Sequence, residues 1–372
     1  MRLASFNLEN LFDRARALNQ DTWEDGRKVL DAYARLNRVF NKPTYTAADK
    51  QAILDGLKTL GLLKADDGGK FALLRQNRGR LLKRPNTGPV QVVAAGRGDW
   101  VGWLELKREA VNEVATRTTG QVVRDVGADV LAVVEVENRT AVQRFNAQVL
   151  TSVGGAPYGH AMVIDGNDER GIDVGIMTRG PFPIASIRSH VDDEADGGLI
   201  FSRDCPEYEV RLPAGGEPLI VLANHLKSKG YGAAAESNAR RRRQAQRIRE
   251  IYDGLRLAGR SLIAVVGDFN DVPDSVPLEP LLADGSELRD VSRHPLYKDD
   301  GRPGTFGNGT KSQKFDYVLL SPALFNRVTS AAVFRKGVWG GTHGTLWEIY
   351  PEMTEPVHAA SDHAAIWVDL DV

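Results

Sequence analysis

Residues 262–271 have the sequence Leu-Ile-Ala-Val-Val-Gly-Asp-Phe-Asn-Asp, and this stretch contains the pattern on which a prediction of the fold rests. The apolar run from Leu262 to Val266 is typical of a buried strand. Asp268 and Asn270 follow it two positions apart, so both side chains leave the backbone on the same side of the pleat. The stretch therefore predicts a polar edge at the end of a buried strand.

The same arrangement recurs along the chain. The other polar pairs at strand ends are Asn7 with Glu9, Glu135 with Glu137, and His225 with Lys227. Asp316 and the pair Asp362-His363 instead stand directly before apolar runs. Strand ends and strand starts meet at one rim only where neighbouring strands are antiparallel. We therefore predict mixed sheets with a single polar rim.

Apolar runs alternate with helical patterns over most of the chain, which predicts an α/β protein. The expected strands are 3–8, 130–136, 174–178, 219–224, 262–266, 317–320 and 364–370, and the expected long helices are 109–126 and 238–257. Residues 14–107 interrupt this alternation, and we interpret them as an insertion or subdomain after the first strand. It contains a predicted helix from Ala47 to Leu60, capped by Thr46, and a basic stretch from Arg75 to Arg84.

Composition excludes several classes of protein. The chain has 372 residues, a formal net charge of −1 and 42% hydrophobic residues, which is typical of a globular protein. No window approaches the roughly 18 apolar residues of a membrane span. One cysteine, Cys205, excludes an internal disulfide framework and a thiolate-rich zinc site. No signal-peptide pattern precedes the first strand, so we expect a cytoplasmic protein, or a secreted one if a signal has been removed.

The predicted rim has a definite chemistry. Carboxylate and amide oxygens without thiolates suit Mg²⁺ or Mn²⁺, as one or two ions, and such ions commonly take a phosphate as a further ligand. A histidine held by a carboxylate can serve as a general base or donate to a phosphate oxygen. Metal, histidine and amide donors together suit phosphodiester hydrolysis. Any single one of these acids could be only a turn or cap residue, so the prediction rests on their joint occurrence.

Six stretches resemble the endonuclease/exonuclease/phosphatase superfamily and occur in that family's order. They are residues 5–13 (Ser-Phe-Asn-Leu-Glu-Asn-Leu-Phe-Asp), 134–138 (Val-Glu-Val-Glu-Asn), 224–229 (Asn-His-Leu-Lys-Ser-Lys), 267–271 (Gly-Asp-Phe-Asn-Asp), 315–317 (Phe-Asp-Tyr) and 361–363 (Ser-Asp-His). The resemblance implies a four-layer α/β sandwich of two packed mixed sheets with outer helices, formed by residues 1–372 apart from the inserted subdomain.

The resemblance also implies roles for individual residues. The implied metal ligands are Glu135, Asp362, Asn7, Asp268 and Asn270. The implied catalytic residues are His363, Asp316, His225, Asp268, Asn270 and Asn7. Asp268 and Asn270 would orient the attacking water, and His363, oriented by Asp316, would be the general base or a phosphate donor. Glu9, Glu137 and Asp173 would contact these residues and hold them in position without binding the metal or the substrate themselves.

Within the superfamily the chain most resembles bacterial secreted nucleases. The residues that carry this likeness are 168–174 (Asp-Glu-Arg-Gly-Ile-Asp-Val), the run from His225 to Lys229, and Asn238, Arg241, Gln244 and Ala245. Signatures of the inositol-phosphatase and apurinic-endonuclease branches are missing. The resemblance thus implies a nucleic acid substrate, with DNA favoured, and neither a membrane nor a protein partner is evident. The candidate substrate-binding residues are Arg170, Lys227, Asn238, Arg241 and Trp339.

Alternative interpretations accompany each of these features. The arginines of the helix from Asn238 could equally form a solvated face, the basic stretch Arg75 to Arg84 could be a charged hairpin, and Trp339 could pack in the core rather than stack on a base. A phosphomonoesterase or a phospholipid-headgroup phosphodiesterase of the same fold is the main rival function, because a fold does not determine a substrate. A binding protein without catalytic activity is disfavoured, since every expected acid, amide and histidine is present.

Overall fold

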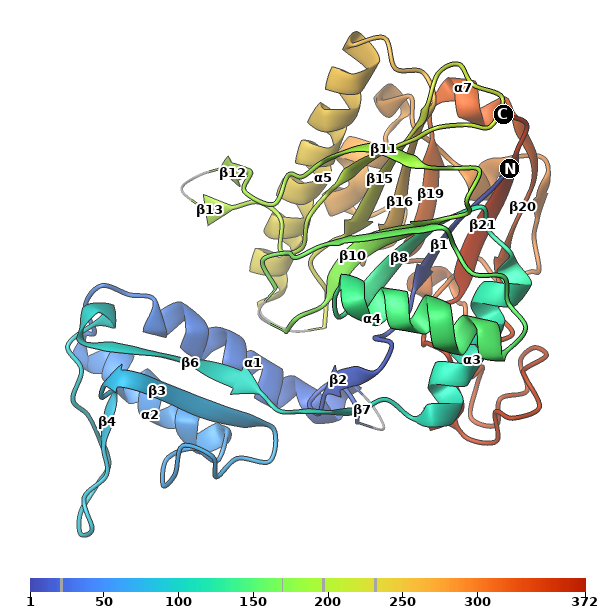
Figure 1. Ribbon diagram of the computed structural model, residues 1–372. Helices are drawn as coiled ribbons and strands as arrows, with labels where there is room; N and C mark the ends of the chain where they lie inside the picture. Colours follow the sequence, from blue (N-terminus) through green and yellow to red (C-terminus); the bar gives the residue numbers. More distant parts are fainter. Residues whose placement is uncertain (21–22, 169, 196–197, 231–232) are drawn as a thin grey trace. The chain divides into compact units, whose positions relative to one another are not determined.

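The computed structural model describes residues 1–20, 23–168, 170–195, 198–230 and 233–372 (Figure 1). The chain divides into two compact units, one formed by residues 1–12, 111–229 and 235–372, and the other by residues 13–110 with the segment 230–234. The first unit contains every residue for which the sequence predicts a role at the polar rim. None of the described helices is long and apolar enough to cross a membrane.

The first unit contains two mixed sheets. The seven-stranded sheet has the order β18 (Tyr297–Lys298), β20 (Val328–Phe334), β21 (Ala365–Leu370), β1 (Arg2–Asn7), β8 (Val130–Val136), β10 (Asp173–Thr178) and β9 (His160–Ile164). The six-stranded sheet has the order β11 (Ile184–Arg188), β14 (Glu207–Val210), β15 (Leu219–His225), β16 (Ile263–Asp268), β19 (Asp316–Leu320) and β17 (Arg289–Asp290). The predicted strands are thus confirmed to within about one or two residues at each end.

Three hydrophobic clusters hold these sheets in four layers. Side chains such as Ala132, Ala264 and Ile366 fill the space between the two sheets. The outer side of the seven-stranded sheet is covered by α3 (Glu113–Val126), and that of the six-stranded sheet by α5 (Ala234–Leu257). Figure 1 shows α5 along one side of the sandwich. The predicted four-layer α/β sandwich is confirmed.

Shorter elements complete the first unit. They are α4 (Arg139–Arg144), continued by a π-helical segment (Phe145–Leu150), α6 (Glu279–Leu282), α7 (Pro322–Phe325), the hairpin strands β12 (Glu194–Ala195) and β13 (Gly198–Leu199), and five 3₁₀ turns (Val276–Leu278, Asp284–Ser286, Val291–Arg293, Lys311–Gln313 and Pro356–His358).

Two predicted helix starts are wrong. The helix expected from Glu109 begins at Glu113, because Glu109 belongs to strand β7 and Asn112 is the N-cap whose side chain accepts a hydrogen bond from the Val114 amide. The helix expected from Asn238 begins earlier, at Ala234. In both cases a weak apolar pattern at the first turn left the boundary open to error.

The second unit has a core of its own. Helices α1 (Trp23–Phe40) and α2 (Ala47–Thr59) pack against the hairpin of β3 (Ala72–Gly79) and β6 (Trp100–Leu106). Thr46 caps α2 through a capping box with Asp49, as the sequence predicts. The remaining elements are the paired strands β2 (Asp13–Ala15) and β7 (Arg108–Ala110), the pair β4 (Leu82–Lys83) and β5 (Gln91–Val92), and a 3₁₀ turn (Arg97–Asp99).

Candidate active site

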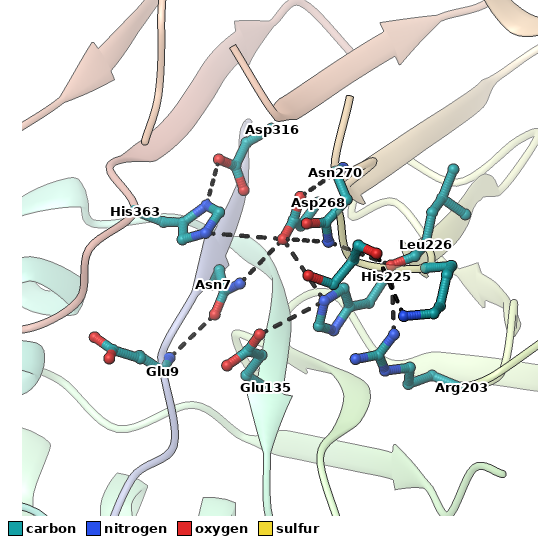
Figure 2. A network of polar contacts seen from close by, with 12 residues as sticks. Asn7, Glu9, Glu135, Arg203, His225, Leu226, Asp268, Asn270, Asp316 and His363 are labelled. Carbon is teal, nitrogen blue, oxygen red and sulfur yellow. Dashed lines mark hydrogen bonds and ion pairs between the residues drawn. The ribbon is translucent and has the colours of Figure 1, made fainter. Parts of the chain in front are cut away.

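The polar rim lies where strands of both sheets end or begin. β1 runs parallel to β8, and β15 runs parallel to β16, so their carboxyl ends carry Asn7, Glu135, His225 and Asp268 to the same edge. β19 is antiparallel to β16 and therefore begins at this edge with Asp316, which stands opposite Asp268 in the register. Figure 2 shows these side chains pointing toward one another. The mixed topology thus produces the single rim that the polar pairs predict.

Asp268 stands at the centre of the rim. Its Oδ1 accepts the Asn270 backbone N–H at 2.8 Å, and its Oδ2 accepts the amide groups of Asn270 at 3.0 Å and Asn7 at 3.3 Å. Burial raises the pKa of this carboxyl to about 7; the positive charge of His363 opposes the rise, and the negative charge of Asp316 adds to it. A carboxylate in this position gains from a nearby cation, because a cation offsets the cost of burying its charge.

His363 and Asp316 form a buried pair beside Asp268. The His363 Nδ1 lies 2.8 Å from the Asp316 Oδ2, and its Nε2 lies 3.8 Å from the Asp268 Oδ2 (Figure 2). Burial lowers the pKa of His363, but the charges of Asp316 and Asp268 outweigh burial and raise that pKa well above its ordinary range. An N–H that donates to Asp316 fixes the ring orientation and leaves Nε2 to face the rim.

His225 and Glu135 form the other side of the rim. The His225 Nε2 lies 3.5 Å from the Glu135 Oε1 and 3.6 Å from the Asp268 Oδ2. Burial lowers the pKa of His225 well below its ordinary value, and the positive charges of Arg203 and Arg170 lower it further. Its Nδ1 is buried without a hydrogen-bond partner among the described residues. A neutral imidazole here can accept one proton or ligate a metal.

The backbone around the rim is strained. Glu9, Asn10, Glu135 and Asn270 have φ values of 50°, 69°, 57° and 54°. Residues other than glycine rarely adopt this left-handed backbone conformation, and each one costs on the order of 1 kcal/mol of folding free energy. Four of the five described non-glycine residues with positive φ thus belong to the predicted motifs at this rim. Such a concentration is typical of a functional site, where the surrounding structure holds side chains in unfavourable but useful positions.

The rim fits a divalent cation. Two sets of side chains each bring three ligand atoms within 4.8 Å of one another, namely Glu135 with His225 and Asp268, and Asp268 with Asp316 and His363. The Glu135 carboxylate lies at this rim within 3.5 Å of the His225 Nε2, and carboxylate and amide oxygens are the ligands that Mg²⁺ and Mn²⁺ prefer. Asp362 contributes an exposed carboxylate whose Oδ1 lies 3.8 Å from the His363 Nε2. The predicted ligands Asn7, Glu135, Asp268, Asn270 and Asp362 therefore share one neighbourhood.

The predicted supporting acids lie behind the rim. Glu137 is buried, and its carboxylate accepts the backbone N–H groups of Leu11 and Phe12, at 3.1 Å and 2.6 Å, so it fixes the segment that follows β1. The Glu9 carboxylate accepts the Asp362 backbone N–H at 3.2 Å. This hydrogen bond connects the segment that follows β1 to the segment that precedes β21. Asp173 accepts the Gly166 N–H at 2.8 Å, and burial raises the pKa of its carboxyl to about 7.

Arg241 is not placed to bind substrate directly, which corrects the prediction. Its side chain is fully buried, and Nε, Nη1 and Nη2 donate to Asp271, to the Lys227 carbonyl and to the Asn238 side chain. Each of its three nitrogens thus donates to the protein, because the arginine lies on the inward stripe of α5. Asn238 is likewise a partner of this arginine. Both residues hold the segment from Leu226 to Lys229 in place.

The other arginines of α5 are mostly paired on the surface. Arg247 lies 2.7 Å from Asp193, Arg249 lies 2.8 Å from Asp253, and Arg242 lies 3.2 Å from Glu279. This is the solvated face that the sequence left open as an alternative. Trp339 is half-buried against the cluster beneath α3, and its indole N–H points to the Thr342 carbonyl at 3.5 Å. The core-packing alternative for Trp339 therefore agrees with the structure.

A cationic cluster lies beside His225, and one of its members was missed in the sequence. Arg203 is 1% exposed; its Nε lies 3.0 Å from the Asp168 Oδ2, its Nη1 donates to the Leu226 carbonyl at 3.3 Å, and its Nη2 has no hydrogen-bond partner among the described residues. Asp168 also pairs with Arg170 at 2.6 Å. No motif marks Arg203, because only the tertiary structure brings it to Asp168.

Lys227 completes this cluster. Burial lowers the pKa of its ammonium group to about 7, and the charges of Arg170 and Arg203 lower it further. Arg170 and Arg203 both contact the Asp168 carboxylate, and Lys227 lies close enough to feel the charges of all three. The predicted substrate-binding residues Arg170 and Lys227 therefore lie where a phosphate group would be attracted.

Comparison with known proteins agrees with this geometry. The family model described as "Endonuclease/Exonuclease/phosphatase family" matches residues 112–363. No curated protein matches the chain at a significant level. Among solved structures, an endonuclease/exonuclease/phosphatase family protein from Bacteroides thetaiotaomicron has a TM-score of 0.51 at 17% identity, covering 68% of this chain and 86% of the other.

A mannosyl-6-phosphatase from Bacteroides thetaiotaomicron has the same TM-score of 0.51 at 17% identity, covering 70% of this chain and 92% of the other. Likenesses at this identity show a common fold. The family model adds the identity of the family, because it spans most of the sandwich, from the N-cap of α3 to His363. The chain therefore belongs to the endonuclease/exonuclease/phosphatase family.

Proposed function

We propose that the protein is a divalent-metal-dependent phosphodiesterase, and that its substrate is a nucleic acid, namely DNA. The observation that supports this best is the meeting of Asn7, Glu135, His225, Asp268 and the pair Asp316–His363 at one rim. Family membership supports hydrolysis of a phosphoester bond. The cationic cluster of Arg170, Arg203 and Lys227 beside His225 supports a polyanionic substrate, which carries further phosphates next to the one that is cut.

Different residues of the chain would bind the metal, orient the attacking water and donate to the phosphoryl oxygen during in-line hydrolysis. Glu135, Asn7 and Asp268 would hold Mg²⁺ or Mn²⁺, which when bound polarises the phosphoryl oxygen and offsets its negative charge. Asp268, fixed by Asn270, accepts a hydrogen bond from the attacking water and directs it at phosphorus. His363, oriented by Asp316 through Nδ1, donates from Nε2 to a phosphoryl oxygen as negative charge develops there.

This assignment chooses between the two roles that the sequence leaves open for His363. A general base needs a free lone pair, whereas the contact of Nδ1 with Asp316 and the neighbouring carboxylates favour an imidazole that carries protons on both nitrogens. His225 faces the same rim from the opposite sheet and provides a second polar group for the phosphate. Together they surround the reacting group with positive or neutral donors.

Incubation with supercoiled plasmid is the decisive experiment. Purified protein is incubated with the plasmid in EDTA and then after magnesium or manganese is added back. Nicking that requires the metal supports an endonuclease, and degradation of linear or single-stranded DNA alone supports an exonuclease. Hydrolysis of small phosphate monoesters with every nucleic acid left intact would overturn the proposal in favour of a phosphatase. The Glu135→Gln variant controls for contaminating nucleases.

A further inference from the structure

The hairpin of the second unit has one face covered and one face open. Along β3 and β6 the side chains alternate between the two faces, and Leu74 and Leu104 point into the core that α1 and α2 cover. Trp100 shows how this unit buries an aromatic ring, since it is 2% exposed, packs edge-on against Phe40 and donates its N–H to the Tyr45 hydroxyl. The core is therefore complete without the opposite face.

That opposite face presents aromatic, aliphatic and basic side chains together. Trp103 pairs with Arg75 across the two strands, and Val101 pairs with Arg78. Directly opposed residues of antiparallel strands project from the same face, so these four side chains form one surface, here named the hairpin face. Trp103 is 45% exposed and Val101 is 41% exposed. The hairpin face therefore places an exposed aromatic ring next to a second exposed apolar side chain.

The charges of this region are largely uncompensated. Within the described part of the chain, two members of the basic stretch Arg75 to Arg84 have acidic partners, Arg75 with Glu105 at 2.8 Å and Arg84 with Asp66 at 2.7 Å. Arg78, Arg80 and Lys83 are exposed and have no ion pair or hydrogen-bond partner for their side chains among the described residues. The hairpin face is therefore flanked by positive charge, and the polymer complementary to it is anionic.

We propose that the hairpin face binds single-stranded nucleic acid, with one base stacked on Trp103 and neighbouring phosphates contacted by Arg78 and Arg80. An exposed aromatic ring on a sheet next to arginines is the arrangement that binds unpaired bases, since every base has a flat face that can stack. A duplex offers no free base face to Trp103, which is why a single strand fits better. The inference goes beyond the proposed catalytic activity, because binding at this face needs neither the metal nor the rim.

Binding is measured with the full-length protein by fluorescence anisotropy of a fluorescein-labelled oligothymidylate in EDTA, so that no cleavage occurs. Trp103→Ala should weaken binding at least about fivefold, and Trp103→Phe should keep most of the affinity because it retains a ring. The double substitution Arg78→Ala with Arg80→Ala should make the negative slope of log affinity against log salt concentration shallower by about 1.4, because two phosphate contacts are lost.

A matched pair of charges controls for non-specific attraction. Arg35 on α1 and Lys58 on α2 are exposed on the helical part of the same unit, so Arg35→Ala with Lys58→Ala removes the same charge away from the hairpin face. The proposal is overturned if this control weakens binding as much as the Arg78 and Arg80 changes, or if Trp103→Ala binds like the wild type. Trp103-dependent binding to phosphatidylserine vesicles, with none to the oligonucleotide, would instead identify a membrane surface.

The outcome can be separated from that of the catalytic proposal. A protein that cuts no nucleic acid but binds the oligonucleotide through Trp103 would sustain this inference and refute the proposed nuclease. In the opposite case, a nuclease whose binding ignores Trp103 would refute only this inference. Hydrolysis of a small phosphodiester such as bis(p-nitrophenyl) phosphate should be unchanged in the Trp103 variants, because that substrate has no base or neighbouring phosphate to bind at the hairpin face.

Discussion

At the scale of single residues, Asp268 connects the two groups of side chains that could hold a metal. It accepts hydrogen bonds from Asn7 and Asn270 and faces both histidines, so its carboxylate position depends on residues from both sheets. Glu135 approaches it from the other sheet on a backbone with a φ of 57°. Metal affinity and the rate of turnover should therefore respond differently to substitutions at Glu135 and at Asp316.

Glu135→Gln should reduce turnover on the order of 100-fold or more and weaken Mn²⁺ binding, because the amide is a poorer ligand than the carboxylate. Isothermal titration with Mn²⁺ measures the affinity, and steady-state kinetics with saturating metal measure the rate. Wild-type rates at saturating metal would mean that Glu135 is no more than a ligand of secondary importance. An unchanged metal affinity would remove it from the ligand set.

Asp316→Asn should lower kcat by about 100-fold or more with little change in KM or metal affinity, because the imidazole of His363 loses the partner that orients it. The comparison with Glu135→Gln is the control, since both changes replace a carboxylate with its amide. A parallel loss of metal affinity in Asp316→Asn would show instead that Asp316 acts as a metal ligand.

At the scale of elements, the buried His190 connects segments on the side of the six-stranded sheet that α5 covers. His190 is 3% exposed, its Nδ1 lies 2.8 Å from Asp193, and its Nε2 lies 2.7 Å from Glu207 in β14. Asp193 in turn accepts the Nε–H of Arg247 in α5 at 2.7 Å. Burial lowers the pKa of His190, but the hydrogen bonds to Glu207 and Asp193 outweigh burial and raise it above the ordinary 6.5.

This arrangement makes the sandwich less stable at alkaline pH. A raised pKa in the folded state means that the contribution of His190 to stability is complete below the ordinary value of 6.5 and is lost as pH rises through the folded-state value. The free energy of unfolding, measured with urea at about pH 6 and about pH 9, should therefore fall more steeply in the wild type than in His190→Gln. His343→Gln, in an exposed loop, should keep the wild-type dependence; equal slopes for wild type and His190→Gln would contradict this.

At the scale of the whole molecule, the chain has separate hydrophobic cores in its two compact units. The cluster around Leu57 contains residues of the second unit alone, whereas Leu222 belongs to the cluster beneath α5. Cores that share no residues can lose their packing independently, and unfolding then departs from a single cooperative transition.

Leu57→Ala and Leu222→Ala each remove a fully buried side chain and should each cost roughly 2–5 kcal/mol of stability. Calorimetry should show that Leu57→Ala lowers one transition temperature and Leu222→Ala another. Hydrolysis of a small phosphodiester below both transitions should remain near the wild-type rate in Leu57→Ala. A single transition that both substitutions shift equally would show instead that the two units unfold together.

Much of this molecule could be predicted from local pattern. Strand periodicity and the two-residue spacing of Asp268 with Asn270 are properties of a few consecutive residues, so the strands, the mixed sheets and the membership of the rim follow without knowledge of distant contacts. The family's motif order then implied the four-layer sandwich. The helix starts at Glu113 and Ala234 differ from the predicted ones, because a cap or a short strand changes the first turn without changing the apolar pattern.

Only the tertiary structure decided what each polar side chain meets. Arg241 lies in a motif and Arg203 does not, yet Arg241 is enclosed by Asp271, Asn238 and a carbonyl, whereas Arg203 joins the cationic cluster beside His225. Glu137 directly follows the strand that contains Glu135, but its carboxylate accepts the amides of Leu11 and Phe12. Periodicity gives the face from which a side chain projects. The partner on that face comes from another segment, which for Glu137 and Leu11 is 126 residues away in the chain, and the positions of such segments depend on the packing of the whole sandwich.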